Sequence, residues 1–134
     1  MAPPCGTFSR ARERPNPKAL RQKGVPEPRP LRSQKLPFGL PGLTAVEQIR
    51  VDKANTLAIF VAEVAHLASK KGILWSIENP RSSLLWWCEP LSALLGLPGA
   101  LDMDFQACMH GGHRDKWSRF RTNVAEVSPL AVAC

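Results

Sequence analysis

The sequence predicts an α/β fold that carries a basic N-terminal arm. Two observations predict it: prolines and positive charge gather in residues 1–43, and a long helical pattern is followed by a glycine and a short apolar run. A helix, a turn and a buried strand in succession are typical of α/β sheets. We therefore divide the 134 residues into an arm, residues 1–43, and an α/β domain, residues 44–134.

The arm holds nine of the 13 prolines, which exclude a long helix or a central strand. It also holds nine Lys or Arg against Glu13 and Glu27, whereas residues 44–134 carry equal numbers of bases and acids. The whole net charge of +7 therefore lies on the arm. An extended or disordered basic arm favours a polyanionic partner, and a solubilising tail is the alternative.

A helix is predicted over about residues 45–71. Thr44 and Glu47 have the spacing of a capping box, apolar residues then recur with a helical period, and Gly72 suits the end of the helix. Residues 73–77 follow as a short buried strand. The strand would end in Glu78-Asn79-Pro80, and ligands of open α/β sheets bind beyond the carboxyl ends of strands.

Weaker patterns predict the remaining elements. We expect short helices over residues 82–87 and 90–96, strands over 104–109 and 119–124, and a turn at Gly111-Gly112. Of the four tryptophans, Trp75, Trp86 and Trp87 are expected in the core. Trp117 lies in a basic cluster, where it could either pack or stack on a base.

The chain has the features of an intracellular protein, nuclear or cytoplasmic, with no membrane partner. No secretory signal is visible, and the apolar stretch over residues 57–68 is too short to span a bilayer. The four cysteines form no paired motif, so reduced thiols are expected. Cys108, His110 and His113 could be zinc ligands, but polar loop residues fit their spacing better.

Two residues are candidates for chemistry. Cys5 follows two prolines that fix the backbone, and the nearby arginines favour its thiolate form. A small buried cysteine is the commoner alternative for such a residue. Glu78 closes an apolar run, where a carboxylate needs a partner or a ligand, although it could simply cap a following helix.

Together these residues resemble a known family. Pro3-Pro4-Cys5 with Phe8-Ser9 is similar to the nucleophile loop of DNA cytosine-5 methyltransferases, and Glu78-Asn79 resembles that family's Glu-Asn motif. Residues 113–119 with Thr122-Asn123 resemble its later arginine motif, in the form closest to phage and mobile-element versions. The fold implied is an incomplete Rossmann-like methyltransferase sheet.

The resemblance implies a role for each residue. Cys5 would attack C6 of a cytosine flipped out of its duplex, and Glu78 would stabilise the protonated ring nitrogen. Asn79 would hold the loop, and Arg119, or alternatively Arg114, would contact the cytosine carbonyl. DNA is the implied partner, with phosphate contacts from cations of the arm: Arg10, Arg12, Arg14, Lys18, Arg21 and Lys23.

The chain also departs from the family. Gly6 stands where glutamine is usual and Pro80 where valine is usual, and no glycine-rich loop for S-adenosylmethionine occurs. The cofactor is thus implied only by resemblance, and the chain would be inactive alone and would need a second chain to supply the missing half. A non-catalytic nucleic-acid-binding module and a non-functional mobile-element fragment are the alternatives.

Overall fold

The protein is a mixed α/β structure with a small antiparallel sheet. The structure, a computed structural model, describes residues 1–113 and 115–133. Strands β1 (Ser76–Pro80), β2 (Leu101–Gln106) and β3 (Trp117–Thr122) lie in the order β1-β3-β2, and β3 runs antiparallel to both neighbours. The helices are α1 (Lys18–Gln22), α2 (Ala45–Lys70) and α3 (Glu89–Ser92). Within the described part of the chain, no helix has the length and apolar character needed to cross a membrane.

The helix predicted over about residues 45–71 is confirmed as α2, Ala45–Lys70. Thr44 and Glu47 form the expected capping box, because the Thr44 side chain accepts from the Glu47 N–H while the Glu47 carboxylate accepts from the Thr44 N–H at 2.9 Å. At the other end, Gly72 has a φ of 67°, and the Ile73 N–H reaches back to the Ala68 carbonyl at 2.9 Å. This Schellman arrangement satisfies the last carbonyls of the helix.

The first strand was predicted three residues too early. The helix ending engages Ile73, and Ile73 and Leu74 are 57% and 66% exposed. Asn123 binds this connection from both sides, because its amide donates to the Ile73 carbonyl and its Oδ1 accepts from the Trp75 N–H. Strand pairing therefore begins at Ser76, and Glu78-Asn79 lie within β1 rather than beyond it.

The later elements were predicted in the right order with shifted boundaries. Short helical turns follow β1 over Leu84–Trp87, Glu89–Ser92 and Ala93–Gly96. The strand predicted over 104–109 is β2, which ends at Gln106 because residues 107–110 form a turn of 3₁₀-helix that Gly111 ends with a φ of 81°. The strand predicted over 119–124 is β3, two residues earlier.

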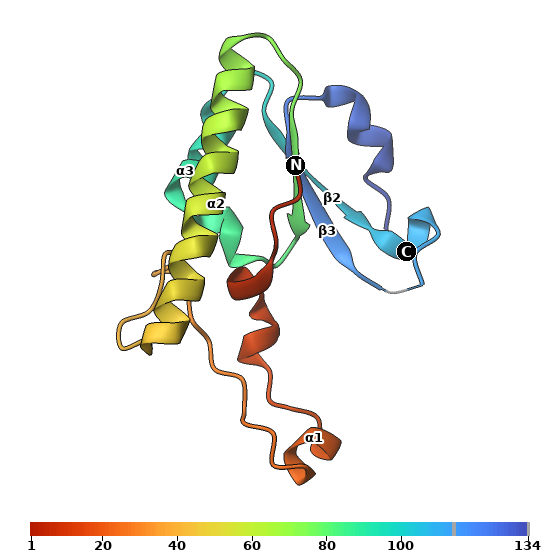
Figure 1. Cartoon of the computed structure of the whole chain (residues 1–134). Helices are drawn as coiled ribbons and strands as arrows, with labels where there is room; N and C mark the ends of the chain where they lie inside the picture. Colours follow the sequence, from red (N-terminus) through yellow and green to blue (C-terminus); the bar gives the residue numbers. More distant parts are fainter. Residues whose placement is uncertain (114, 134) are drawn as a thin grey trace.

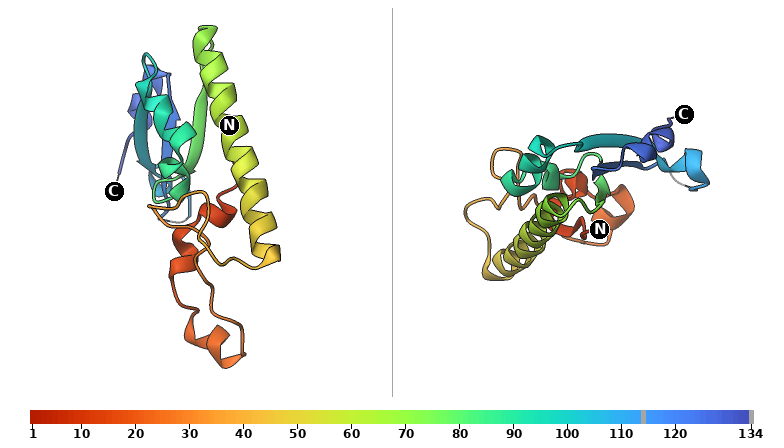
Figure 2. Two further views of the ribbon diagram at one scale, coloured as in Figure 1. Left: turned by 90° about the vertical axis from the view of Figure 1, so that its left-hand side faces the viewer. Right: turned by 90° about the horizontal axis from the view of Figure 1, so that it is seen from above.

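The core lies between α2, the α3 region and β1. It contains small residues of α2, such as Ala58 and Ala65, together with Ile77, Leu85 and Leu91. Trp75 and Trp86 are buried as predicted, whereas the expectation for Trp87 is wrong, because its side chain is 52% exposed. Figure 1 shows α2 crossing the whole body, and Figure 2 shows it running along one side of the sheet near α3.

Residues 9–31 leave the body and return to it (Figure 1). They contain only short helical turns, including α1, in keeping with their proline content. Asn16 closes the excursion, because its amide donates to the Val25 and Pro26 carbonyls and its N–H donates to Glu27 at 2.7 Å. The arm is thus a long looped projection with internal contacts.

Candidate functional site

The N-terminal segment runs alongside β1. The Met1 nitrogen donates to the Ser76 carbonyl, and the Glu78 N–H donates to the Met1 carbonyl at 2.8 Å. One residue bonding to two positions that flank Ile77 is the pattern of a parallel pair. Two residues on, the Asn79 side chain donates to the Pro3 carbonyl at 2.7 Å. Residues 1–3 therefore lie beside Glu78-Asn79, and Cys5 follows directly.

Cys5 stands at the start of a tight turn. Its carbonyl accepts from the Phe8 N–H at 2.7 Å, and residues 6–8 form a single 3₁₀ turn. Thr7 and Phe8 are buried, whereas Cys5 is a free, partly buried thiol. The buried residues anchor the turn and leave the thiol accessible.

Glu78 lies on the opposite face of the sheet from Arg119. In the register, Glu78 is opposite Phe120 and Asn79 is opposite Arg119. Because alternate residues of a strand point to opposite faces, the Glu78 and Arg119 side chains diverge. The Glu78 carboxylate lies 3.5 Å from the Lys116 ammonium and is 27% exposed. The structure thus aligns the Cys5 segment with Glu78 and Asn79 and separates Arg119 from Glu78.

Arg119 is engaged by two aspartates of β2. It pairs with both carboxylate oxygens of Asp104, at 2.6 and 3.0 Å, and with Asp102 at 3.1 Å. The hydrogen bonds to Asp104 raise the pKa of Arg119, and Asp102 adds to this effect. A paired arginine of this kind supports the sheet. Arg114, the other candidate for the cytosine carbonyl, lies outside the described residues.

The buried amide of Asn79 has a free acceptor. Its side chain is 1% exposed, and Oδ1 has no hydrogen-bond partner among the described residues, although Nδ2 is bonded to Pro3. Buried polar atoms without partners are rare in proteins. Asn79 thus holds the segment before Cys5 through its Nδ2, and its Oδ1 is left available to accept a hydrogen bond from a ligand.

A cavity of about 620 Å³ lies at this end of the sheet and is lined by Lys116, the ion-pair partner of Glu78, but not by Cys5, Glu78 or Asn79 themselves. Its volume is in the range of small-molecule sites. The Arg81 guanidinium lies 4.9 Å from the centre of the Trp117 ring, and Lys116 is the partner of Glu78. Sequence reasoning missed Arg81, which belongs to no recognised motif, and assigned no role to Lys116, although it lies within residues 113–119. The cavity is lined by Arg14, Pro80, Arg81, Ser82, Asp115, Lys116 and Trp117.

The cations of the arm lie on its surface. Arg14, Lys18, Arg21 and Lys23 are exposed, and Arg10 and Arg12 are partly buried. Two of the six have acidic neighbours, because Arg10 lies 3.9 Å from Glu13 and Arg21 lies 3.2 Å from Glu27. The projection, whose tip carries α1 away from the body (Figure 1), therefore bears more cations than acidic neighbours.

Arg32 is a second residue that sequence reasoning missed. It is 1% exposed and donates to the Thr7 hydroxyl from two nitrogens, at 2.9 and 3.1 Å. Its guanidinium also stacks on the Phe8 ring, 3.7 Å from the ring centre. No sequence motif marks it, because buried and exposed arginines look alike in a basic segment.

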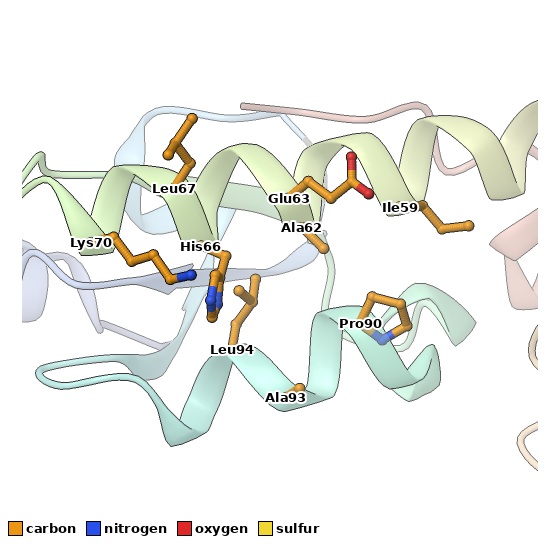
Figure 3. A pocket seen from close by; sticks show the side chains of 9 residues that line it. All are labelled: Ile59, Ala62, Glu63, His66, Leu67, Lys70, Pro90, Ala93 and Leu94. Carbon is orange, nitrogen blue, oxygen red and sulfur yellow. The ribbon is translucent and has the colours of Figure 1, made fainter.

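A separate cavity of about 430 Å³ lies between α2 and α3. Figure 3 shows His66 and Lys70 close together at one end of it, with Ala93 and Leu94 on the other wall. Neither Cys5, Glu78 nor Arg119 lines this cavity. It is therefore distinct from the candidate site.

Within residues 1–113 and 115–133, no three His, Cys, Asp or Glu residues are grouped as a metal site would need. No protein family model matches the chain, and neither a curated protein nor a solved structure shows significant similarity to it.

Proposed function

We propose that this chain is the catalytic portion of a DNA cytosine-5 methyltransferase-like enzyme that requires a second polypeptide for activity. The observation that carries the proposal is the parallel pairing of Met1 with β1 together with the hydrogen bond from Asn79 to the Pro3 carbonyl, which put the segment just before Cys5 beside Glu78-Asn79. Cys5 would supply the nucleophile for C6 of cytosine, and Glu78 would hydrogen-bond the ring nitrogen as charge develops there.

The topology supports a fragment of a larger Rossmann-like sheet. The N-terminal segment pairs in parallel with β1, and α2 is the intervening helix, which is the composition of a βαβ unit. Strands β1 and β2 also run parallel to each other, because both are antiparallel to β3. The carboxyl ends of all three parallel segments therefore lie at the edge that carries the cavity, where such folds bind ligands.

The residues of this chain do not fit the methyl donor. S-adenosylmethionine bears a sulfonium cation, whereas the cavity at the strand ends is lined by Arg14, Arg81 and Lys116 against one carboxylate, Asp115. Within the described residues, no glycine-rich turn follows β1, and the turn after β2 carries only the pair Gly111-Gly112. We therefore derive no methyl-transfer step from this chain and assign the donor site to a partner.

The outer side of α2 supports a polypeptide partner. Its large apolar residues face outward, while small ones face the core, and they recur at the spacing of a helix–helix seam. Arg50, Lys53 and Lys71 continue the same spacing. A helix of the partner with an apolar seam and flanking carboxylates would cover it. The exposed apolar residues of this seam, 36–59% exposed, are Val46, Ile49, Leu57, Phe60, Val64 and Leu67.

The seam is continuous with a free strand edge. Because Met1 bonds to β1, the Ala2 N–H and carbonyl point to the other side, where no described residue pairs with them. A cavity of about 240 Å³ between Pro3-Pro4 and Leu57 joins this edge to α2. The partner would thus place a strand beside Ala2 and a helix on α2, which extends the sheet.

The test is covalent trapping on duplex DNA that contains 5-fluorocytosine. The full chain is incubated with this DNA and S-adenosylmethionine, with and without the donor-binding half of a cytosine-5 methyltransferase that ends before its own nucleophile motif. We expect an adduct in the complemented reaction that is lost in Cys5→Ser and kept in Cys108→Ser, which alters another partly buried thiol. Absence of a Cys5-dependent adduct in both reactions would refute the proposal.

A non-catalytic nucleic-acid-binding module is the second candidate. It is favoured by the positive surface of the arm and by the Arg81–Trp117 pair, since aromatic rings beside cations bind single strands. It predicts salt-sensitive DNA binding that Cys5→Ser leaves unchanged, with no adduct under any condition. Binding that survives deletion of residues 9–31 would contradict it.

A further inference from the structure

Arg32 is a buried cation that has no carboxylate partner among the described residues. Its five N–H groups make five hydrogen bonds, all to neutral acceptors. Two go to the Thr7 hydroxyl, and the others go to the Val51 carbonyl, the Asn55 side chain and the Pro37 carbonyl. The residue therefore joins the turn after Cys5 to α2 and to the loop before it.

This arrangement is costly, and ion pairing does not explain it. Burial lowers the pKa of Arg32 to about 10, and the charge of Asp52 opposes this effect only in part. The guanidinium remains charged at neutral pH, so its desolvation must be offset by the contacts that it makes. Two of the five hydrogen bonds and the ring contact go to Thr7 and Phe8, two and three residues after Cys5.

The same junction closes the base of the arm. The chain leaves the body after Phe8 and returns at Leu31, and both residues are 1% exposed. The returning segment of the arm is held by the Leu40 N–H, which donates to the Leu31 carbonyl at 2.9 Å. Arg32 therefore sets where the Cys5 turn lies relative to α2 and to the arm.

We propose that Arg32 acts through the Thr7 hydroxyl as a positioning residue for Cys5. The importance of the thiol rests on the proposed function. The contact itself can be tested without DNA. Thr7→Val keeps the side-chain shape and removes the acceptor of two Arg32 hydrogen bonds, whereas Thr7→Ser keeps the hydroxyl.

The cysteines provide internal reporters for the test. Cys88 is 0% exposed, and burial raises its pKa to about 11, so it reacts with iodoacetamide only when the core around it opens. Cys5 is partly buried and reports on the turn. Alkylation at pH 8 is followed peptide by peptide by mass spectrometry in the unmodified chain, Thr7→Val, Thr7→Ser and the control Thr56→Val on α2.

We expect Thr7→Val to increase the Cys5 alkylation rate about fivefold and to leave Cys88 unreactive. Thr7→Ser should restore the original rate, and Thr56→Val should leave it unchanged. An unchanged Cys5 rate in Thr7→Val would overturn the proposal, and so would a parallel rise at Cys5 and Cys88, because that indicates opening of the core and not of the Cys5 turn alone. A Cys5-specific rise without any adduct on DNA would retain the positioning role and reject the methyltransferase function.

Discussion

The Asp102→Asn substitution should be among the most destabilising on the sheet. Asp102 pairs with Arg121 through both carboxylate oxygens, each at 2.7 Å, and also with Arg119. Arg121 is 2% exposed, its Nη1 donates to the Leu91 carbonyl at 2.8 Å, and its guanidinium lies 5.0 Å from the centre of the Trp86 ring. Asparagine has the same shape but removes the charge and places an N–H donor against the guanidinium.

The magnitude follows from the burial of the orphaned cation. Breaking a buried ion pair on one side costs about 3–5 kcal/mol, and the 20% exposure of Asp102 favours the lower end. A loss of about 3 kcal/mol corresponds to about 10 °C in Tm for a chain of this length. Asp104→Asn is the matched control, because its arginine partners Arg119 and Arg81 are 25% and 51% exposed. We expect it to cost about 1 kcal/mol.

Urea unfolding followed by circular dichroism measures both variants against the unmodified chain. The account predicts that Asp102→Asn lowers the midpoint markedly more than Asp104→Asn does, with similar slopes for the two transitions. Equal costs for the two substitutions would refute the reasoning, because they would mean that burial of Arg121 does not control the energy of this network.

Three further predictions concern the helix, the arm and the thiols. Thr44→Ala should cost about 1 kcal/mol in urea unfolding through loss of the N-cap, and a cost near zero would contradict the capping box. The hydrogen bond from the Thr44 backbone lowers the pKa of Glu47. The stabilisation of the fold by the Glu47 carboxylate is therefore fully present above its ordinary pKa of 4.5 and is lost as the pH falls through the lowered value. The difference in unfolding free energy between the unmodified chain and Glu47→Gln should shrink below about pH 4.5. Replacing Arg12, Lys18 and Lys23 by Gln should reduce the slope of log K against log salt for duplex DNA by about 2.7 if each contacts a phosphate, while the same change at Lys53 and Lys70 of α2 and at its C-cap Lys71 should not. An unchanged slope for the arm variant would remove the arm from the interface.

Local chemistry explains which parts of the fold could be predicted. The capping box and the glycine ending of α2 are each written in a few consecutive residues, and the helix bounds agree with the structure to one residue. The bounds of β1 depend on Asn123, which binds Ile73 and Trp75 from fifty residues away, and no local pattern encodes that contact. Sheet order and register are also non-local.

The same distinction applies to the candidate site. Cys5 and Glu78 were found because the types and order of residues resemble a family motif. Arg32 and Arg81 were missed because their importance comes from burial and from the Thr7 and Trp117 side chains that they contact. For Arg119, strand alternation rather than motif position determines which face it occupies, and the register places it with Asp102 and Asp104.

The most direct measurement of the central claim is a short cross-link between Cys5 and position 78. The Glu78→Cys variant is treated with a bifunctional thiol-reactive cross-linker that spans about the width of one base, and the linked peptides are identified by mass spectrometry. Thr56→Cys on the exposed side of α2 is the control. The account predicts an intramolecular link from Cys5 to position 78 and none to position 56; no link to position 78 would contradict a shared site for the thiol and the acid.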